Sequence, residues 1–185
     1  MIMRPATPEE RRRFYREEWS KQDLPDFIVH TLSLREFGFD LDGSGPSHRY
    51  NQFMTLEQLE EFLKFRAPYS AYASVALYEN PRKREGWIKA DLVFDIDAKD
   101  LPIKPCGCQK GEVCEICINE AKHIAAEFAD VLRRDLGFRR IKFVYSGRGF
   151  HIRVLDEQAM RLEHNERQQL VSYVTGAVVP ADLAL

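Results

Sequence analysis

The chain has 185 residues, of which 44% are hydrophobic and 30% charged, and its formal net charge is −2 at pH 7. That length and hydrophobic content can bury one substantial core, and the near-neutral charge gives no global basic surface for nucleic acid, although a local cationic groove could still bind it. No signal peptide opens the sequence and no apolar run approaches the length of a membrane span. We therefore expect a cytoplasmic protein that is neither secreted nor membrane-bound.

The first half of the chain predicts helices and short strands in alternation. Thr7 and Glu10 form a capping box with proline at position 8, which predicts an amphipathic helix as far as Ser20. The other elements expected in this half are a strand over 32–39, a loop over 42–46, a helix over 55–66 opened by Thr55-Leu-Glu-Gln58, a strand over 70–78 and a charged turn over 80–86.

The stretch from Asp91 to Asp100 places two carboxylates, Asp95 and Asp97, at the end of a β-rich apolar run. Alternate residues of a strand point the same way, so these acids share one face about 6.5–7 Å apart, and Asp91 is expected on the same side. Carboxylate oxygens suit hard divalent cations, and a two-metal site needs such ligands on a rigid element. The pattern favours a divalent-metal site over a merely solvated strand end.

Two further β-rich runs are joined by the turn Ser146–Gly149, whose glycines permit positive φ and close backbone approach to a ligand. Arg148, His151 and Arg153 would form a cationic edge. Arginine forks match phosphate oxygens, and an imidazole can donate to them. An ordinary hairpin with a solvated outer face is the alternative. The nearby acids favour phosphate binding, because a polyphosphate bound through Mg²⁺ needs both carboxylates and cations.

The four cysteines of the chain are close together in the sequence, at Cys106, Cys108, Cys114 and Cys117. A Cys-x-Cys pair followed by a Cys-x-x-Cys pair is a good arrangement for tetrahedral zinc held by four cysteine ligands. Such zinc would be structural, because four thiolates leave no open coordination position. Disulfides and an iron–sulfur cluster are the alternatives, and a reducing cytosol disfavours disulfides.

A strong helix over 118–136, ended by Gly137, and a second helix over 156–173 complete the expected elements. The order strand, helix, strand, strand, helix predicts an α+β fold with helices on one sheet face and the site on the other. We expect a single domain over residues 1–185, with the zinc element inserted at 104–118.

Taken together, these motifs resemble the small catalytic subunit of archaeal and eukaryotic DNA primase. The matching segments run in order from about residue 10 to residue 175, and the archaeal branch is the most similar because a zinc knuckle follows its acidic strand. The segments are Leu34–Phe37 with Glu36, His48–Phe53 with Arg49, Val93–Asp100, the cysteine cluster and Ser146–His151.

The resemblance implies a mixed α/β primase-polymerase catalytic core with a zinc-knuckle insertion. It implies that Asp95 and Asp97 hold two Mg²⁺ or Mn²⁺ ions. The nucleotide-binding residues that it implies are Ser146, Arg148, His151 and Arg49, with Glu36 beside Arg49. The implied reaction is template-directed addition of ribonucleotides, and in archaeal members also deoxynucleotides, to start a primer on single-stranded DNA for replication. The usual partner is a primase large subunit.

One departure from the family pattern affects the expected activity. Family members carry a third catalytic carboxylate further along, in a segment that this sequence does not contain, and Asp182 lies in no matching motif. Removing a shared metal ligand weakens a two-metal site, so we expect little activity from this chain alone.

Other functional classes stay open. One is a non-catalytic zinc module that binds nucleic acid or a partner. Another is an aspartate-nucleophile phosphatase, which requires threonine or valine where this chain has Lys99. A related end-joining repair polymerase is a third.

Overall fold

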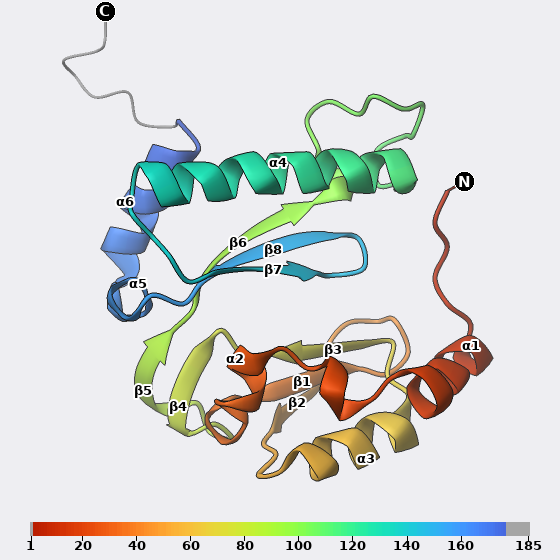
Figure 1. Ribbon diagram of the computed structural model, residues 1–185. Helices are drawn as coiled ribbons and strands as arrows, with labels where there is room; N and C mark the ends of the chain where they lie inside the picture. The colour runs from red at the N-terminus through yellow and green to blue at the C-terminus, as the bar shows by residue number, and fades with distance from the viewer. Residues whose placement is uncertain (1, 177–185) are drawn as a thin grey trace, which may run out of the picture. The chain divides into compact units, whose positions relative to one another are not determined.

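The computed structural model describes residues 2–176, which form two compact units (Figure 1). The N-terminal unit is Arg4–Ala90, and the C-terminal unit begins at Asp91 and also includes residues 2 and 3. Each unit combines helices with antiparallel sheets. The predicted α+β class is therefore confirmed.

The expected single catalytic core over 1–185, with its insertion at 104–118, stays a prediction. Asp182 lies outside the described residues. Within those residues, no helix is both long enough and apolar enough to span a bilayer.

The N-terminal unit contains two small sheets. One has strand order β2-β1-β3, and the other pairs β4 with β5; all the pairings are antiparallel. The chain also makes a π-helical turn at Phe14–Glu18 and 3₁₀ turns at Lys21–Asp23 and Leu32–Leu34. The regular elements are α1 (Pro8–Arg13), α2 (Asp26–Val29), β1 (Phe37–Asp40), β2 (His48–Asn51), α3 (Leu56–Arg66), β3 (Ser70–Ala73), β4 (Ala76–Asn80) and β5 (Glu85–Ala90).

The capping boxes at the starts of α1 and α3 form as the sequence indicates. The Glu10 N–H donates to Thr7 Oγ1 at 3.2 Å, and the Thr7 N–H donates to Glu10 Oε2 at 2.7 Å. Thr55 caps α3 in the same way. The first helix ends at Glu18 rather than Ser20, because its last turn widens into the π-helical form.

Two strand predictions in this unit are wrong in part. The segment predicted as a strand over 32–39 begins as a 3₁₀ turn, and β1 starts only at Phe37. The segment predicted over 70–78 divides at Ser74, whose hydroxyl accepts from the Glu36 N–H at 3.1 Å and donates to the Ala76 carbonyl at 2.6 Å. These side-chain bonds compete with a strand ladder, so β3 and β4 join different sheets.

The C-terminal unit is built on one antiparallel sheet of order β6-β8-β7. The helix predicted over 118–136 is confirmed but begins three residues earlier, at Glu115. The helix predicted over 156–173 is interrupted, because Glu163 makes a new capping box with Glu166. The elements are β6 (Leu92–Asp97), a 3₁₀ turn (Ala98–Asp100), α4 (Glu115–Arg134), β7 (Ile141–Tyr145), β8 (Gly149–Val154), α5 (Glu157–Arg161) and α6 (His164–Val174).

Helix α4 runs along one face of this sheet and provides its main apolar cover (Figure 1). Phe94 of β6 and Ile152 of β8 lie side by side in the register and point into this core. Because strand side chains alternate, the neighbouring residues Asp95 and His151 face the opposite side. The buried members of the core are Leu92, Phe94, Ala125, Ala129, Leu132, Ile152, Val154 and Ala159.

We expect Gly149→Ala to destabilise the C-terminal unit. A Cβ at this position would overlap the carbonyl oxygen of Ile96 and lie 2.9 Å from the Asp97 Cα, and backbone in a sheet cannot move aside cheaply. The expected loss is about 2 kcal/mol of unfolding free energy, measured by urea denaturation. Gly107→Ala is the control, because a Cβ there meets no atom within 4 Å. Equal midpoints for the two variants would show that the strands have room to separate.

Candidate metal and nucleotide site

Pairing of β6 with β8 brings the predicted acidic strand beside the predicted phosphate-binding hairpin. Asp95 lies opposite His151 in the register, and Asp97 lies opposite Gly149. The His151 Nε2 atom is 3.4 Å from Asp95 Oδ1. The acids, an imidazole and the turn residues are therefore neighbours in one sheet, although they are far apart in the sequence.

The two acids differ in their surroundings. The Asp95 side chain is 64% exposed, whereas Asp97 is held by Lys99, whose Nζ lies 2.8 Å from Oδ2 and whose N–H donates to Oδ1 at 3.0 Å. Burial raises the pKa of Asp97, but the Lys99 hydrogen bonds and the charges of Lys99 and Arg148 outweigh it, so the pKa lies below its ordinary value. Asp97 is thus fixed as a carboxylate, and Asp95 is the more accessible oxygen donor.

The hairpin turn is held by backbone bonds on both sides. The Ser146 N–H donates to the Gly149 carbonyl at 3.0 Å, and Gly147 adopts φ +91°, which favours glycine. The Arg148 carbonyl accepts from the Ala98 N–H at 3.0 Å, and its guanidinium Nη2 donates to the Gly111 carbonyl at 3.0 Å. Arg148 therefore links the acidic strand, the turn and the cysteine-rich loop.

The row of acids and the cationic edge each contain one residue fewer than predicted. Asp91 and Arg153 are buried, with Arg153 Nη1 2.6 Å from Asp91 Oδ2. A buried carboxylate needs an opposite charge, so this pair compensates itself away from solvent. Of the three cations assigned to the edge, Arg148 and His151 remain beside Asp95 and Asp97.

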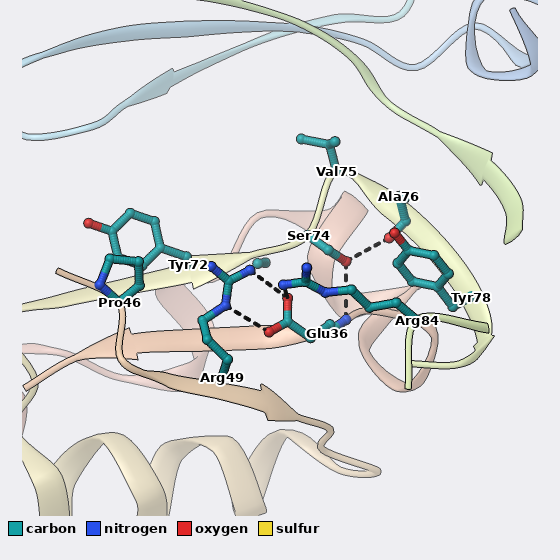
Figure 2. Close-up of a pocket in the computed structure, with 10 residues that line it drawn as sticks. Glu36, Pro46, Arg49, Tyr72, Ser74, Val75, Ala76, Tyr78 and Arg84 are labelled. Carbon is teal, nitrogen blue, oxygen red and sulfur yellow. Dashed lines mark hydrogen bonds and ion pairs between the residues drawn. The ribbon is translucent and has the colours of Figure 1, made fainter. Parts of the chain in front are cut away.

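The other two predicted residues, Arg49 and Glu36, belong to the N-terminal unit. Arg49 donates through Nε at 3.0 Å and Nη2 at 3.2 Å to the two carboxylate oxygens of Glu36 (Figure 2). A second arginine, Arg84, donates to the same carboxylate at 3.1 Å. Sequence reasoning missed Arg84, which lies in a charged turn with no motif around it.

The four cysteines form a cluster that could hold a metal ion. Their Sγ atoms all lie within 4.8 Å of one another; the Cys106–Cys117 pair is 3.2 Å apart and the Cys114–Cys117 pair 3.8 Å. Tetrahedral zinc with Zn–S bonds of about 2.3 Å requires sulfur separations of about 3.8 Å, and the observed separations lie on either side of that value, so small side-chain shifts would complete the site. The Cys117 N–H group at the start of α4, helped by the Cys108 and Cys106 side chains, lowers the pKa of Cys114 to about 6, although burial opposes this. Thiolate, the form that binds metal, is favoured there.

The cysteine cluster is packed against the end of the acidic strand. Cys114 and Cys117 share a buried apolar cluster with Ala98, Leu101 and Ala121. Ala98 directly follows Asp97. The cysteine-rich element therefore supports the segment that carries the carboxylates.

We expect one tightly bound metal ion per chain, measured by elemental analysis of the purified protein. Cys117→Ala should lose that ion and lower the melting temperature, because it removes a ligand that is fully buried. Ile116→Ala alters an exposed residue between two ligands and is the matched control. A wild-type chain without metal after growth in zinc-supplemented medium would contradict the assignment.

Comparison with known proteins identifies the family. A family model of the DNA primase small subunit matches residues 94–180. The DNA primase small subunit PriS of Pyrococcus horikoshii is 51% identical over 179 residues, which cover 97% of this chain and 52% of that protein. PriS of Methanobrevibacter smithii is 52% identical over 175 residues, covering 95% of this chain and 53% of that protein.

PriS of Methanothermobacter thermautotrophicus is 48% identical over 179 residues, covering 97% of this chain and 55% of that protein. The chain spans about half the length of the curated relatives it matches. None of these names favours a phosphatase or a non-catalytic zinc module. The order of motifs, the α+β architecture and these similarities lead to one conclusion: the chain belongs to the DNA primase small subunit family, in its archaeal branch.

Proposed function

We propose that this chain carries part of the nucleotidyl-transfer centre of a DNA primase, which starts primers on single-stranded DNA for replication. The reaction adds ribonucleotides, and also deoxynucleotides, under the direction of a template. The proposal is carried by the β6–β8 register, which sets Asp95 opposite His151 and Asp97 opposite Gly149. Carboxylates beside a cationic phosphate-binding turn are the groups that metal-dependent phosphoryl transfer requires.

The acidic pair has the chemistry for a hard divalent cation. Asp95 and Asp97 both offer carboxylate oxygens, and the exposure of Asp95 leaves its oxygens accessible from solvent. When a cation binds, Lys99 would either move away from Asp97 or share the Asp97 carboxylate with the cation. We assign Mg²⁺ or Mn²⁺ to Asp95 and Asp97; when bound, such ions neutralise charge on the triphosphate and on the attacking and leaving oxygens.

The hairpin residues are assigned to the phosphates of the incoming nucleotide. Arg148 offers a planar fork for two phosphate oxygens, and Ser146 offers a hydroxyl donor at the start of the turn. His151 can donate from its imidazole, and its contact with Asp95 orients the ring. Arg49 of the N-terminal unit is proposed as a further nucleotide-binding residue. These groups bind and orient the triphosphate, which supplies much of the catalysis in phosphoryl transfer.

The cysteine cluster is proposed to hold zinc in a structural role. Thiolates are soft ligands that select zinc over hard cations, and four of them close a tetrahedral shell. The proposed substrates are nucleoside triphosphates and a single-stranded DNA template, and the proposed partner is a primase large subunit. The relatives are named small subunits, which supports that partner. The cytoplasm, at the replication fork, is the proposed location.

Calorimetric titration with a nucleoside triphosphate in Mg²⁺ or Mn²⁺ tests the site. Asp95→Asn and Arg148→Ala should each weaken binding about tenfold or more, because each removes a charged contact. Asp130→Asn and Arg161→Ala change exposed charges on α4 and α5, away from the site, and should bind as the wild type does. Unchanged affinity in both site variants would mean that the assigned pocket is wrong.

A further inference from the structure

A pocket of about 300 Å³ lies entirely within the N-terminal unit (Figure 2). Its charged lining residues are Glu36, Arg49 and Arg84, so two cations and one anion give it a net charge of +1. Arg49 comes from β2, and Arg84 comes from the turn between β4 and β5. A concave site with excess positive charge and several N–H donors suits an anion.

Glu36 is the point to which both arginines are anchored. It is only 2% exposed, and its carboxylate accepts bonds from Arg49 Nε at 3.0 Å, Arg49 Nη2 at 3.2 Å, Arg84 Nη2 at 3.1 Å and the Tyr50 N–H at 2.8 Å. Burial raises the pKa of Glu36, but these donors and the two positive charges outweigh it and lower the pKa. Glu36 is therefore a fixed anion that orients two guanidinium groups.

Both guanidinium groups keep donors for a ligand. A guanidinium carries five N–H bonds, and Glu36 engages two from Arg49 and one from Arg84. Each arginine side chain is 36% exposed. Among the residues that the structure describes, Glu36 is the only acid paired with either of them. The remaining N–H groups are therefore open to an anion that enters the pocket.

The backbone around the pocket adopts costly conformations that place these arginines. Tyr50 and Arg84 have φ of 64° and 55°, in the left-handed region that side chains other than glycine disfavour. The Arg84 guanidinium lies 5.0 Å from the centre of the Tyr50 ring. A Cβ at Gly38 would lie 2.8 Å from Arg49 Nε, so glycine makes room for that side chain. Backbone strain of this kind gathers at binding sites.

We propose that this pocket binds a phosphate group of a nucleotide or of a nucleic-acid strand, with Arg49 and Arg84 as its ligands and Glu36 as a positioning residue. Two guanidinium forks match phosphate oxygens. Tyr72, which lines the pocket and is 47% exposed, offers a ring on which the adjoining base stacks. The choice of nucleotide or strand as ligand rests on the proposed function. Binding here needs no divalent cation, because both phosphate ligands are cationic side chains.

The test measures binding of ATP and of a labelled oligothymidine to the full chain without added Mg²⁺ or Mn²⁺. Arg84→Gln keeps a donor to Glu36 but removes the charge, and it should weaken binding of at least one probe about tenfold. If the strand is the ligand, the slope of log affinity against log salt should also fall by about 0.7. Arg66→Gln, an exposed arginine at the end of α3, is the matched control.

Glu36→Gln tests whether Glu36 affects binding by orienting the two arginines or only through its charge. This change raises the pocket's net charge by one unit, so charge alone would tighten binding of a phosphate. If Glu36 acts by orienting Arg49 and Arg84, binding should weaken instead. Urea denaturation shows whether the variant is folded. Tighter or unchanged binding by the folded variant would overturn the positioning role.

Failure of this inference is distinguishable from failure of the proposed function. If Arg84→Gln binds both probes like the wild type, while Asp95→Asn still weakens metal-dependent nucleotide binding, the pocket assignment is wrong and the primase site stands. Because the Arg84 side chain is 36% exposed and lies in a turn, its replacement should leave the protein folded. It therefore keeps the inference testable even if Glu36→Gln does not fold.

Discussion

The antiparallel pairing of β6 with β8 determines where the charged groups of the candidate site lie. In a strand ladder the side of every side chain follows from the register, and a slip of one residue would transfer the acids to the α4 face. Gly149 lets the β8 backbone approach Ile96 and Asp97 closely, where any larger residue would collide. The same pairing carries Phe94 and Ile152 into the core, so apolar packing and placement of the acids are set together.

The acidic residues fall into two groups: buried carboxylates that are paired with arginine, and carboxylates that solvent or a cation can reach. Asp91 and Glu36 are buried, and each is satisfied by arginine. A buried ion pair of this kind costs desolvation, which its hydrogen bonds must offset, and such pairs fix geometry more than they add stability. Asp95, in contrast, is solvent-accessible, with the His151 Nε2 atom 3.4 Å from its Oδ1. This contrast indicates which carboxylate is free to take a cation and which ones hold other side chains in place.

The sequence predicted best those features that depend on local chemistry. The capping boxes at Thr7 and Thr55, the long amphipathic helix and the acidic strand formed as expected, because neighbouring residues determine them. The cysteine cluster could also be predicted from the sequence, because the spacing of its four candidate ligands is visible within one short segment. Of the candidate site, the approach of the acids to the Ser146–Gly149 turn was anticipated from the chemistry that phosphate binding requires.

The features that were missed depend on contacts between distant segments. The division at Ser74 arises from its bonds to Glu36 and Ala76, and no local pattern signals the first of these partners. The burial of Arg153 depends on Asp91, which lies 62 residues away in the sequence. Strand β2 was not predicted, because its four residues are mostly polar and show no apolar alternation. It forms by backbone pairing with β1. In each of these cases, contacts with residues far away in the sequence outweighed the local structural preference.

The bond from Arg148 to the Gly111 carbonyl has a consequence for the cost of ligand capture. A long side chain normally loses considerable rotational freedom when it is immobilised, and that loss subtracts from affinity. Here the guanidinium is already docked on a neutral oxygen before any anion arrives. In the proposed function, exchange of that oxygen for a charged phosphate would trade a weaker bond for one roughly twice as strong. Part of the loss of side-chain entropy would thus occur during folding rather than on binding, because the arginine already has a fixed conformation.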